Sequence, residues 1–553
     1  MNQTIIKSLA KKSERGQAII LLAFAFIGLI AMVGLVTDTG VLLIEYGKLK
    51  RSVDAAAVAA AQEYRPNPLA DPDPVTGVRP LNLTAMENAT RTFLQINQIN
   101  NLTDVVVHTC EDTGDDRPDL CNPDPEGNPI ENRKLVEVTA HSDVRFAFLR
   151  VLGINSADVV VTSIGEAATI DLVLLMDTSG SMAYATTGDP YESESGDDPI
   201  ACNVADDCQP MRAIKDVAME FVDSLIYYGY DRVAVIPMTG QVTGPTDAAE
   251  RAPNPDDADE VLPLSFDRNV ILGSIDNLTV YQPRKCPDTL SIDGVGGCLK
   301  FEGSTYITEF CEPYDAAMAL PTEPERGTAN PSSCPSSNFG NMFSMAQDAY
   351  GGSGNPNLQR TDALWVTVMV ASGPANTSTP SDPDLVDYPF GYCPQNTWLL
   401  FAMPDPKPRR CRDAVPGNER SPSSALVPYT NPLSGETTNI SLYDAEDFAR
   451  DMADNLAASK SPNGVTIYTI GLGDGVVREA NGTPAVSCEI ETTAGNRPCG
   501  EAEYLLTYIS RQAGDNLAGS GINHGEYFYS PNDAEMRNIF EIIAQNIATK
   551  ISE

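Results

Sequence analysis

Apolar residues form two patterns along this chain, one near the N-terminus and one beyond residue 168. Residues 18–36 form an uncharged apolar run of about the length that a helix needs to cross a bilayer. Beyond residue 168, short apolar runs alternate with segments whose apolar residues recur at helical spacing. Such short runs are typical of strands buried on both faces of a parallel sheet. The pattern therefore predicts a membrane-spanning helix followed by an α/β domain.

The α/β domain is predicted over residues 169–553. Its order of strands and helices favours a doubly wound, mostly parallel sheet. Long insertions are expected at about 183–210, 240–335 and 376–440. The predicted core strands are 170–175, 232–238, 363–371 and 465–472, and the predicted helices are 211–227, 341–350, 445–458 and a last helix with Ser530 as N-cap, Pro531 at its first position and Asp533 at its third.

The N-terminal region is predicted to be a retained membrane anchor. Residues 1–17 are polar and mainly basic, which favours a cytoplasmic N-terminus. The transmembrane helix of residues 18–37 is expected to continue to about residue 64, because the following segment keeps helix-forming residues and lacks proline. A cleaved signal peptide is the alternative, but the apolar run is long for one and no small-x-small cleavage site follows it cleanly.

Residues 65–168 are predicted to form a small α+β module next to the membrane. Turn-forming residues separate its elements, and a Pro- and Asp-rich segment precedes them. The predicted elements are a helix at 85–98, strands at 105–108 and 135–139, a helix from Val144 that ends at Gly153, and a strand at 159–162.

The composition limits the classes of partner. The formal net charge is −39 and the isoelectric point is near 4.3. Binding to nucleic acid needs a basic face, so nucleic acid is not an expected partner. A well-solvated acidic exterior is the simplest meaning of this charge.

The cysteines indicate an oxidising compartment. All 12 lie beyond residue 100, none is in a CxxC pair, and the chain has only three histidines, which disfavours zinc ligation. The even number favours disulfides, which places the bulk of the chain outside the cytoplasm. Sequence alone does not prove the connectivity. Successive local pairing would join Cys110 with Cys121, Cys202 with Cys208, Cys286 with Cys298, Cys311 with Cys334, Cys393 with Cys411, and Cys488 with Cys499.

The candidate chemistry lies directly after the first core strand. There the chain reads Asp177-Thr-Ser179-Gly-Ser181. In open α/β sheets, ligands bind outside the carboxyl ends of the strands, and hard oxygen donors of this kind suit Mg²⁺. A chance turn is the alternative interpretation of so short a motif.

Asp-x-Ser-x-Ser after a buried strand resembles the metal-ion-dependent adhesion site of von Willebrand factor A domains, which have a Rossmann-like fold. The resemblance implies a Mg²⁺ site, with Mn²⁺ or Ca²⁺ as alternatives, that binds a carboxylate on a protein ligand. Asp177, Ser179 and Ser181 match the family's ligands. Ser337 stands where the family usually has Thr, and Ser372 stands where it typically has Asp. Ser372 is expected to be a peripheral ligand that leaves the metal more weakly bound.

The N-terminal segment carries a second resemblance. The apolar run followed by Asp38, and Asp54-Ala-Ala-Ala in the next part of the helix, are similar to the N-terminus of TadE/TadG-like proteins of Tad/Flp pilus assembly. A generic anchor helix is the alternative. The resemblance implies bacterial pilus components as partners. Gly16 is followed by QAIIL, without the Glu of a pilin-type processing site, so polymerisation like a pilin is not expected.

Two functions remain. The first is a single-pass cell-surface protein that binds a protein ligand through a divalent cation, in adhesion or in Tad-type pilus assembly or anchoring. The alternative is a structural scaffold of the envelope or pilus machinery, with a degenerate, metal-free site. Enzymatic activity is not expected, because the chain has no Walker-type phosphate loop and its histidines lie in no motif with a nucleophile.

Overall fold

The chain divides into two compact units in the computed structural model. Unit 1 comprises residues 1–167 and unit 2 comprises residues 168–551. The structure describes residues 4–99, 101–122, 133–183, 199–238, 262–280, 300–302, 305–307, 337–351, 359–375, 426–430, 437–441, 445–460, 462–477, 489–492, 495–518 and 521–550.

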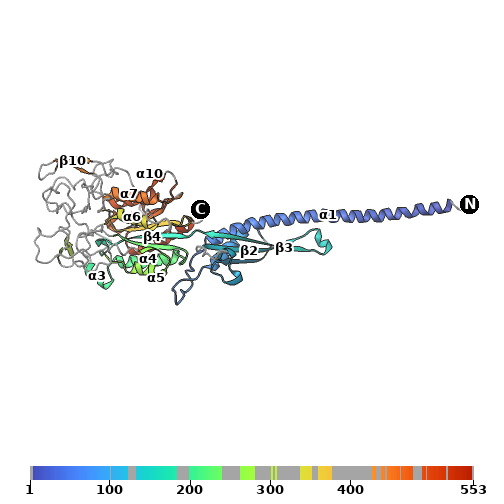
Figure 1. The fold of residues 1–553 in the computed structure, drawn as a ribbon, viewed down its shortest axis with the longest axis horizontal. Helices are drawn as coiled ribbons and strands as arrows, with labels where there is room; N and C mark the ends of the chain where they lie inside the picture. The colour runs from blue at the N-terminus through green and yellow to red at the C-terminus, as the bar shows by residue number, and fades with distance from the viewer. Residues whose placement is uncertain are drawn as a thin grey trace. The chain divides into compact units, whose positions relative to one another are not determined.

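Unit 1 is built on the long helix α1 (Thr4–Ala61), which is drawn in blue in Figure 1. Its segment from Ile19 is long and apolar enough to cross a membrane, and the large apolar side chains of residues 19–36 are 52–70% exposed. Farther along, Leu49, Val53 and Ala60 are almost fully buried. One continuous helix therefore has an exposed apolar part and a part packed against the rest of unit 1.

A helix and a three-stranded antiparallel sheet complete unit 1. Helix α2 (Leu83–Ile96) precedes the sheet, in which β2 lies between β1 and β3. The Ser163 hydroxyl donates to Asp54 of α1 at 2.6 Å, which fixes β3 on the helix. The strands are β1 (Leu102–Thr109), β2 (Lys134–Arg145) and β3 (Ser156–Ala167).

The helix predicted from Val144 to Gly153 is wrong. Strand β2 continues to Arg145, and only a short 3₁₀ turn, η3 (Leu149–Leu152), follows before β3 begins. The reason is a long-range contact, because the Asp38 carboxylate of α1 accepts hydrogen bonds from the backbone N–H groups of residues 147–149. The chain at this point is shaped by a residue more than 100 positions away.

Gly165 allows β3 to approach α1 closely, and this contact gives a testable prediction. A Cβ at Gly165 would lie 2.2 Å from the Ala57 carbonyl oxygen. Gly165→Ala should therefore destabilise unit 1 by about 1–3 kcal/mol, measured as faster hydrogen exchange of the β3 amides. Gly47→Ala is the control, because a Cβ there meets nothing within 4 Å and alanine favours a helix by about 1 kcal/mol. Equal exchange rates in the two variants would contradict a close approach at Gly165.

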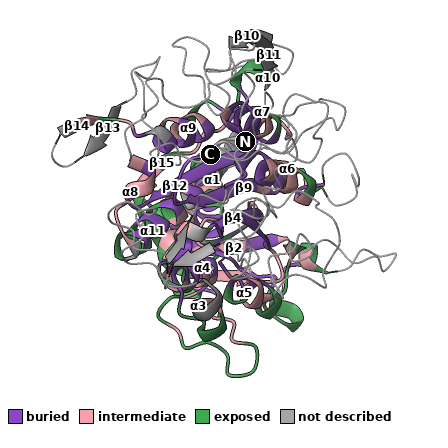
Figure 2. Cartoon of the chain, turned by 90° about the vertical axis from the view of Figure 1, so that its left-hand side faces the viewer, coloured by how far each residue is buried: buried purple, intermediate pink, exposed green. Residues whose placement is uncertain are grey.

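Unit 2 is a mixed α/β unit around a six-stranded sheet (Figure 2). Five strands are parallel, and only the edge strand β6 pairs antiparallel. In spatial order the strands are β15 (Tyr527–Ser530), β12 (Thr466–Leu472), β9 (Leu364–Ala371), β4 (Ile170–Asp177), β5 (Arg232–Met238) and β6 (Leu262–Ser265).

Helices pack on both faces of this sheet, because alternate residues of the buried strands point to opposite sides. Leu172 and Leu174 of β4 belong to one apolar cluster, with residues of α4 (Met211–Leu225), α5 (Arg268–Asp276) and α11 (Asp533–Lys550). Val173 and Leu175 belong to a second cluster, with residues of α6 (Phe339–Ala349), α7 (Ala445–Ala457) and α9 (Glu501–Arg511).

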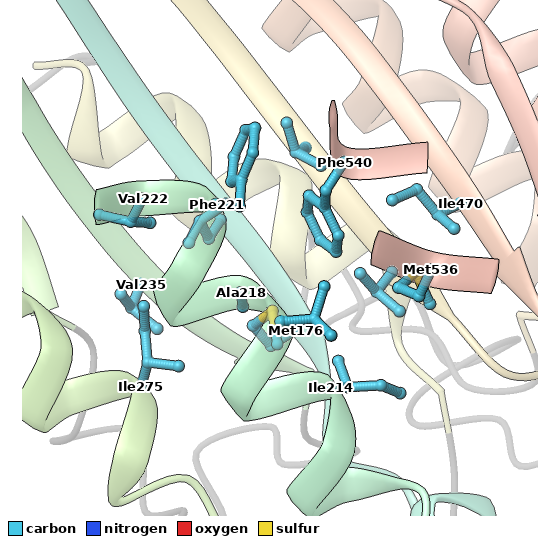
Figure 3. Close-up of a cluster of buried hydrophobic side chains, with 14 of the residues drawn as sticks. Met176, Ile214, Ala218, Phe221, Val222, Val235, Ile275, Ile470, Met536 and Phe540 are labelled. Atoms are coloured by element: carbon cyan, nitrogen blue, oxygen red, sulfur yellow. The ribbon is translucent and has the colours of Figure 1, made fainter. Parts of the chain in front are cut away.

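Figure 3 shows the first of these clusters. The rings of Phe221 on α4 and Phe540 on α11 lie with their centroids 4.8 Å apart. Met176 lies beneath them at the end of β4. The packing of two helices separated by about 300 residues holds the carboxyl end of the central strand from one side.

Shorter elements lie in the predicted insertions and loops. Segment 240–335 supplies the edge strand β6 and helix α5 of the unit itself. The other short elements are η1 (Gly114–Asp116), η2 (Asp119–Cys121), η4 (Gly180–Ala183), α3 (Pro199–Ala205), β7 (Lys300–Glu302), β8 (Thr305–Ile307), β10 (Leu426–Thr430), β11 (Thr437–Ser441), α8 (Asp474–Val477), β13 (Glu489–Thr492), β14 (Gly495–Pro498) and α10 (Asp515–Ala518).

Two of the predicted disulfides are present in the described residues, Cys110–Cys121 and Cys202–Cys208. Cys499 is also disulfide-bonded. The other predicted disulfide residues lie outside the described ones: Cys286, Cys298, Cys311, Cys334, Cys393, Cys411 and Cys488.

The start of the last helix differs from the prediction. Ser530 is the last residue of β15, and its hydroxyl donates to the Asn532 carbonyl oxygen at 2.6 Å. Helix α11 begins at Asp533, and the Asn532 side chain accepts the N–H of Glu535 at 3.1 Å. Asn532 therefore has the capping role that the sequence assigned to Ser530.

A buried ion pair lies at the start of the central strand. Asp171 of β4 is fully buried, and Arg232 of β5 donates to it from Nε at 2.9 Å and from Nη2 at 2.6 Å. Arg360 donates to the same carboxylate and, at 2.8 Å, to the Tyr230 carbonyl oxygen. Two guanidinium groups thus share one anion inside the fold.

Candidate functional site

The candidate site lies where the two central strands end. Strands β4 and β9 are parallel neighbours, with Leu175 opposite Met369. The residue that follows β9 therefore lies beside the end of β4. This geometry places Ser372 next to Asp177, although 194 residues separate them along the chain.

The Asp177 carboxylate is buried and held by both of its oxygens. Oδ1 accepts the backbone N–H of Ser179 at 2.8 Å. Oδ2 accepts the backbone N–H of Ser372 at 2.6 Å and the Ser372 hydroxyl at 2.5 Å. Asp177 is 0% exposed. Its orientation is therefore set by two backbone donors from two different loops.

Three serine hydroxyls lie close to one another at this point, and that of Ser372 contacts the carboxylate. The Ser181 and Ser372 oxygens lie 2.5 Å apart, the Ser179 and Ser181 oxygens 2.7 Å, and the Ser179 and Ser372 oxygens 3.5 Å. The Thr178 hydroxyl donates to the Met238 carbonyl oxygen at the end of β5 at 2.8 Å, which fixes the loop after β4. Asp177, Ser179, Ser181 and Ser372 are called the serine–aspartate cluster below.

Ser372 contacts Asp177 through both its backbone and its side chain. The signal for this contact was present in the sequence, since Ala371-Ser372-Gly373 directly follows a core strand. The role of Ser372 as a peripheral metal ligand stays a prediction.

Ser337 is buried, with 5% of its surface exposed, and it precedes Asn338, the N-cap of α6. The Asn338 side chain accepts the N–H of Asn341 at 3.0 Å. The other four predicted site residues are the members of the serine–aspartate cluster, and the hydrogen bonds described above join them. A role for Ser337 as a metal ligand stays a prediction.

The atoms that the cluster offers to a cation are of the type that a hard divalent cation prefers. All are oxygens, and one group is a carboxylate whose orientation is fixed by hydrogen bonds from backbone N–H groups. In the described part of the chain, no group of three or more His, Cys, Asp or Glu side chains could hold a metal. Within the cluster itself, a cation would bind hydroxyl oxygens and one carboxylate, that of Asp177. It would also compete with the Ser372 hydroxyl for Oδ2 of Asp177.

Fold and site together define a mixed α/β unit with a mostly parallel sheet, an oxygen-lined cluster at its carboxyl edge, and a separate N-terminal unit with a candidate membrane helix. The model of the family described as putative Flp pilus-assembly TadE/G-like matches residues 16–63. This match covers the apolar run of α1 and the rest of the helix as far as its last residue, Ala61. No curated protein matches the chain.

Several solved structures of pilus proteins resemble the chain loosely. The PilB minor pilin from Streptococcus sanguinis is 10% identical, with 81% of this chain and 78% of that chain covered and a TM-score of 0.31. The vWF domain of the type V pili tip protein Mfa5 from Porphyromonas gingivalis is 13% identical, with coverages of 70% and 97% and a TM-score of 0.30. The adhesive tip pilin GBS104 from Group B Streptococcus agalactiae is 11% identical, with coverages of 68% and 100% and a TM-score of 0.31. Because these TM-scores are low, we assign the fold from the strand order of the sheet and not from these structures.

Proposed function

We propose that this chain is a membrane-anchored surface protein of a Tad-type pilus system. Its unit 2 would be a doubly wound domain of the von Willebrand factor A kind that binds a divalent cation and, through it, a carboxylate on a protein ligand. The observation that carries the proposal is the convergence of Asp177 and three serine hydroxyls at the carboxyl ends of β4 and β9. The disulfides support an extracytoplasmic unit 2 with the N-terminus in the cytoplasm.

Each residue of the cluster has a distinct task in this function. Asp177 supplies the negative charge, and the backbone donors of Ser179 and Ser372 keep it pointed into the cluster. Ser179 and Ser181 supply neutral oxygens from one loop, and Ser372 supplies a third from the other. A bound cation would supply an open coordination position for the partner's carboxylate. The role is one of binding, without catalysis.

Titration of Mg²⁺, Mn²⁺ and Ca²⁺ into the full chain in nanodiscs tests the proposal. Asp177→Asn should weaken cation binding at least about tenfold, because the cluster loses its only formal charge; this is a change of roughly 1.4 kcal/mol. Asp267→Asn is the matched control, since Asp267 accepts the N–H groups of Asn269 and Val270 outside the cluster. It should bind like the parent. No binding by the parent at millimolar cation would contradict a cation-dependent function.

A metal-free scaffold is the second candidate. The observation that favours it is that the hydroxyls and the carboxylate of the cluster already satisfy one another by hydrogen bonds. In that case unit 2 would support the pilus apparatus by its surface alone. Its thermal midpoint would then not respond to Mg²⁺, and Asp177→Asn would leave binding to pilus components unchanged.

A further inference from the structure

The loop between β2 and β3 exposes apolar side chains that the proposed function does not use. This loop, residues 146–155, is called the hairpin tip. Phe148 is 45% exposed, Val151 83% and Ile154 51%. Three large apolar side chains on one short loop are costly in water, so their position in unit 1 calls for an explanation.

The hairpin tip is fixed to one place on α1. The Asp38 carboxylate accepts the N–H groups of Ala147 at 3.0 Å, Phe148 at 2.9 Å and Leu149 at 2.6 Å, and only 1% of Asp38 is exposed. A Cβ at Gly34 would lie 2.7 Å from the Phe148 Cβ, so Phe148 packs directly on that glycine. The tip therefore contacts α1 between residues 34 and 38.

This contact lies where the apolar run of α1 ends. At 1.5 Å per residue, residues 18–36 extend over about 28 Å, close to the thickness of the hydrocarbon core of a bilayer. If residues 18–36 cross the membrane, then residues 34–38 lie at its boundary. The exposed apolar side chains of the tip then continue the exposed apolar surface of α1.

The charges around the tip also suit a lipid surface. Arg150 is exposed, and the Arg145 side chain is 87% exposed, with Asp143 at 3.9 Å. Apolar side chains flanked by arginines are typical of segments that lie in the interfacial layer, with their guanidinium groups near lipid phosphates. The apolar side chains suit the acyl chains of a phospholipid, and the arginines suit its phosphate group.

We propose that the hairpin tip is a second membrane contact, which inserts Phe148, Val151 and Ile154 into the interfacial layer beside α1. This inference rests on the proposed membrane anchoring of α1. Asp38 is a positioning residue in this arrangement, because it fixes the tip at the depth where the apolar run stops. Unit 1 is then held to the bilayer at two points, which restricts its tilt.

Tryptophan fluorescence in the full chain tests this contact. Three variants, Phe26→Trp in the apolar run, Val151→Trp in the tip and Val75→Trp, are reconstituted in phosphatidylcholine–phosphatidylglycerol vesicles, with and without brominated acyl chains. Val75 is a matched control, because it is a valine with 89% exposure in the loop that follows α1, whose end lies about 35 Å beyond Asp38 along the helix axis. The parent chain has two tryptophans and supplies the baseline.

Brominated lipid should quench most of the added emission at positions 26 and 151 and little of it at position 75. Quenching at 26 without quenching at 151 would overturn the second contact and leave the anchor intact. Absence of quenching at 26 would remove the anchor itself. Equal quenching at 75 and 151 would show that unit 1 lies flat on the bilayer, which also overturns the inference. Protection of position 151 that grows with protein density would assign the tip to a second copy of the chain.

Discussion

Asp171→Ala is expected to lower the free energy of unfolding of unit 2 by about 3–5 kcal/mol, the range for breaking a buried ion pair. The substitution removes the anion that Arg232 and Arg360 share and leaves both guanidinium groups inside the fold without it. Asp171 lies near the start of β4, whereas the serine–aspartate cluster lies at the opposite end of the same strand. The fold should therefore be weakened without a direct change in the donors of the site.

Urea denaturation followed by tryptophan emission measures this effect. Trp365 is 3% exposed and stacks on Tyr350 with ring centroids 4.7 Å apart, so it reports on the core of unit 2. Asp216→Ala is the control, because the Asp216 side chain is 50% exposed and pairs with Arg212 on the surface of α4. Its effect should stay within about 1 kcal/mol. Equal losses in the two variants would show that the buried pair contributes no more than a surface pair.

Ser372→Asp is expected to make the stability of unit 2 depend strongly on Mg²⁺. The Ser372 hydroxyl lies 2.5 Å from Asp177 Oδ2, so the variant places two carboxylates side by side. Without a cation they repel each other, by about 4 kcal/mol for unit charges 4 Å apart in a medium of intermediate dielectric. A divalent cation reverses the sign of this interaction. The variant should unfold at a lower temperature than the parent in chelator and gain the most from added Mg²⁺.

Ser372→Asn is the matched control for this substitution, since asparagine has the size of aspartate without its charge. Thermal unfolding of the parent and the two variants, in chelator and in Mg²⁺, separates charge from shape. Cation binding by Ser372→Asp should be about tenfold tighter than that of the parent, or more, which is roughly 1.4 kcal/mol. If Mg²⁺ shifts the midpoints of the two variants equally, the cluster does not bind the cation.

The core strands of unit 2 were predictable because burial on both faces leaves a distinct sequence pattern. Strand β5 coincides with the predicted range 232–238, and β9 and β12 begin one residue later than predicted. The edge strand β6 was not predicted. It is short, none of its residues is fully buried, and the exposed Pro263 interrupts its pattern. Proline is tolerated there because an edge strand has one side without a sheet partner.

Long-range hydrogen bonds explain the errors. The apolar residues after Val144 have helical spacing, yet Asp38 takes the N–H groups of residues 147–149 and a hairpin forms instead. Asn532, and not Ser530, caps α11, because Ser530 still belongs to β15, where it pairs with Leu472 of β12. Both outcomes depend on which strand or helix lies nearby. Local sequence does not contain that information.

The site could be predicted in part. The motif after β4 identified Asp177, Ser179 and Ser181, since a polar cluster at the end of a buried strand stands out. The contact of Ser372 with Asp177 follows from the pairing of β4 with β9. A sequence shows which strands exist, but their order in the sheet determines which loops meet.

The direction of β3 relative to α1 has a mechanical consequence. The Ser156 end of β3 adjoins the hairpin tip, and Ser163 and Gly165 contact α1 at Asp54 and Ala57, so strand and helix run the same way. Tension between the anchor and Ala167 would pull β3 lengthwise along its neighbours. All twelve register positions from Lys134–Ala167 to Arg145–Ser156 would then carry load together in shear. An antiparallel ladder loaded in this direction resists as a whole, whereas a ladder pulled sideways opens one bond at a time.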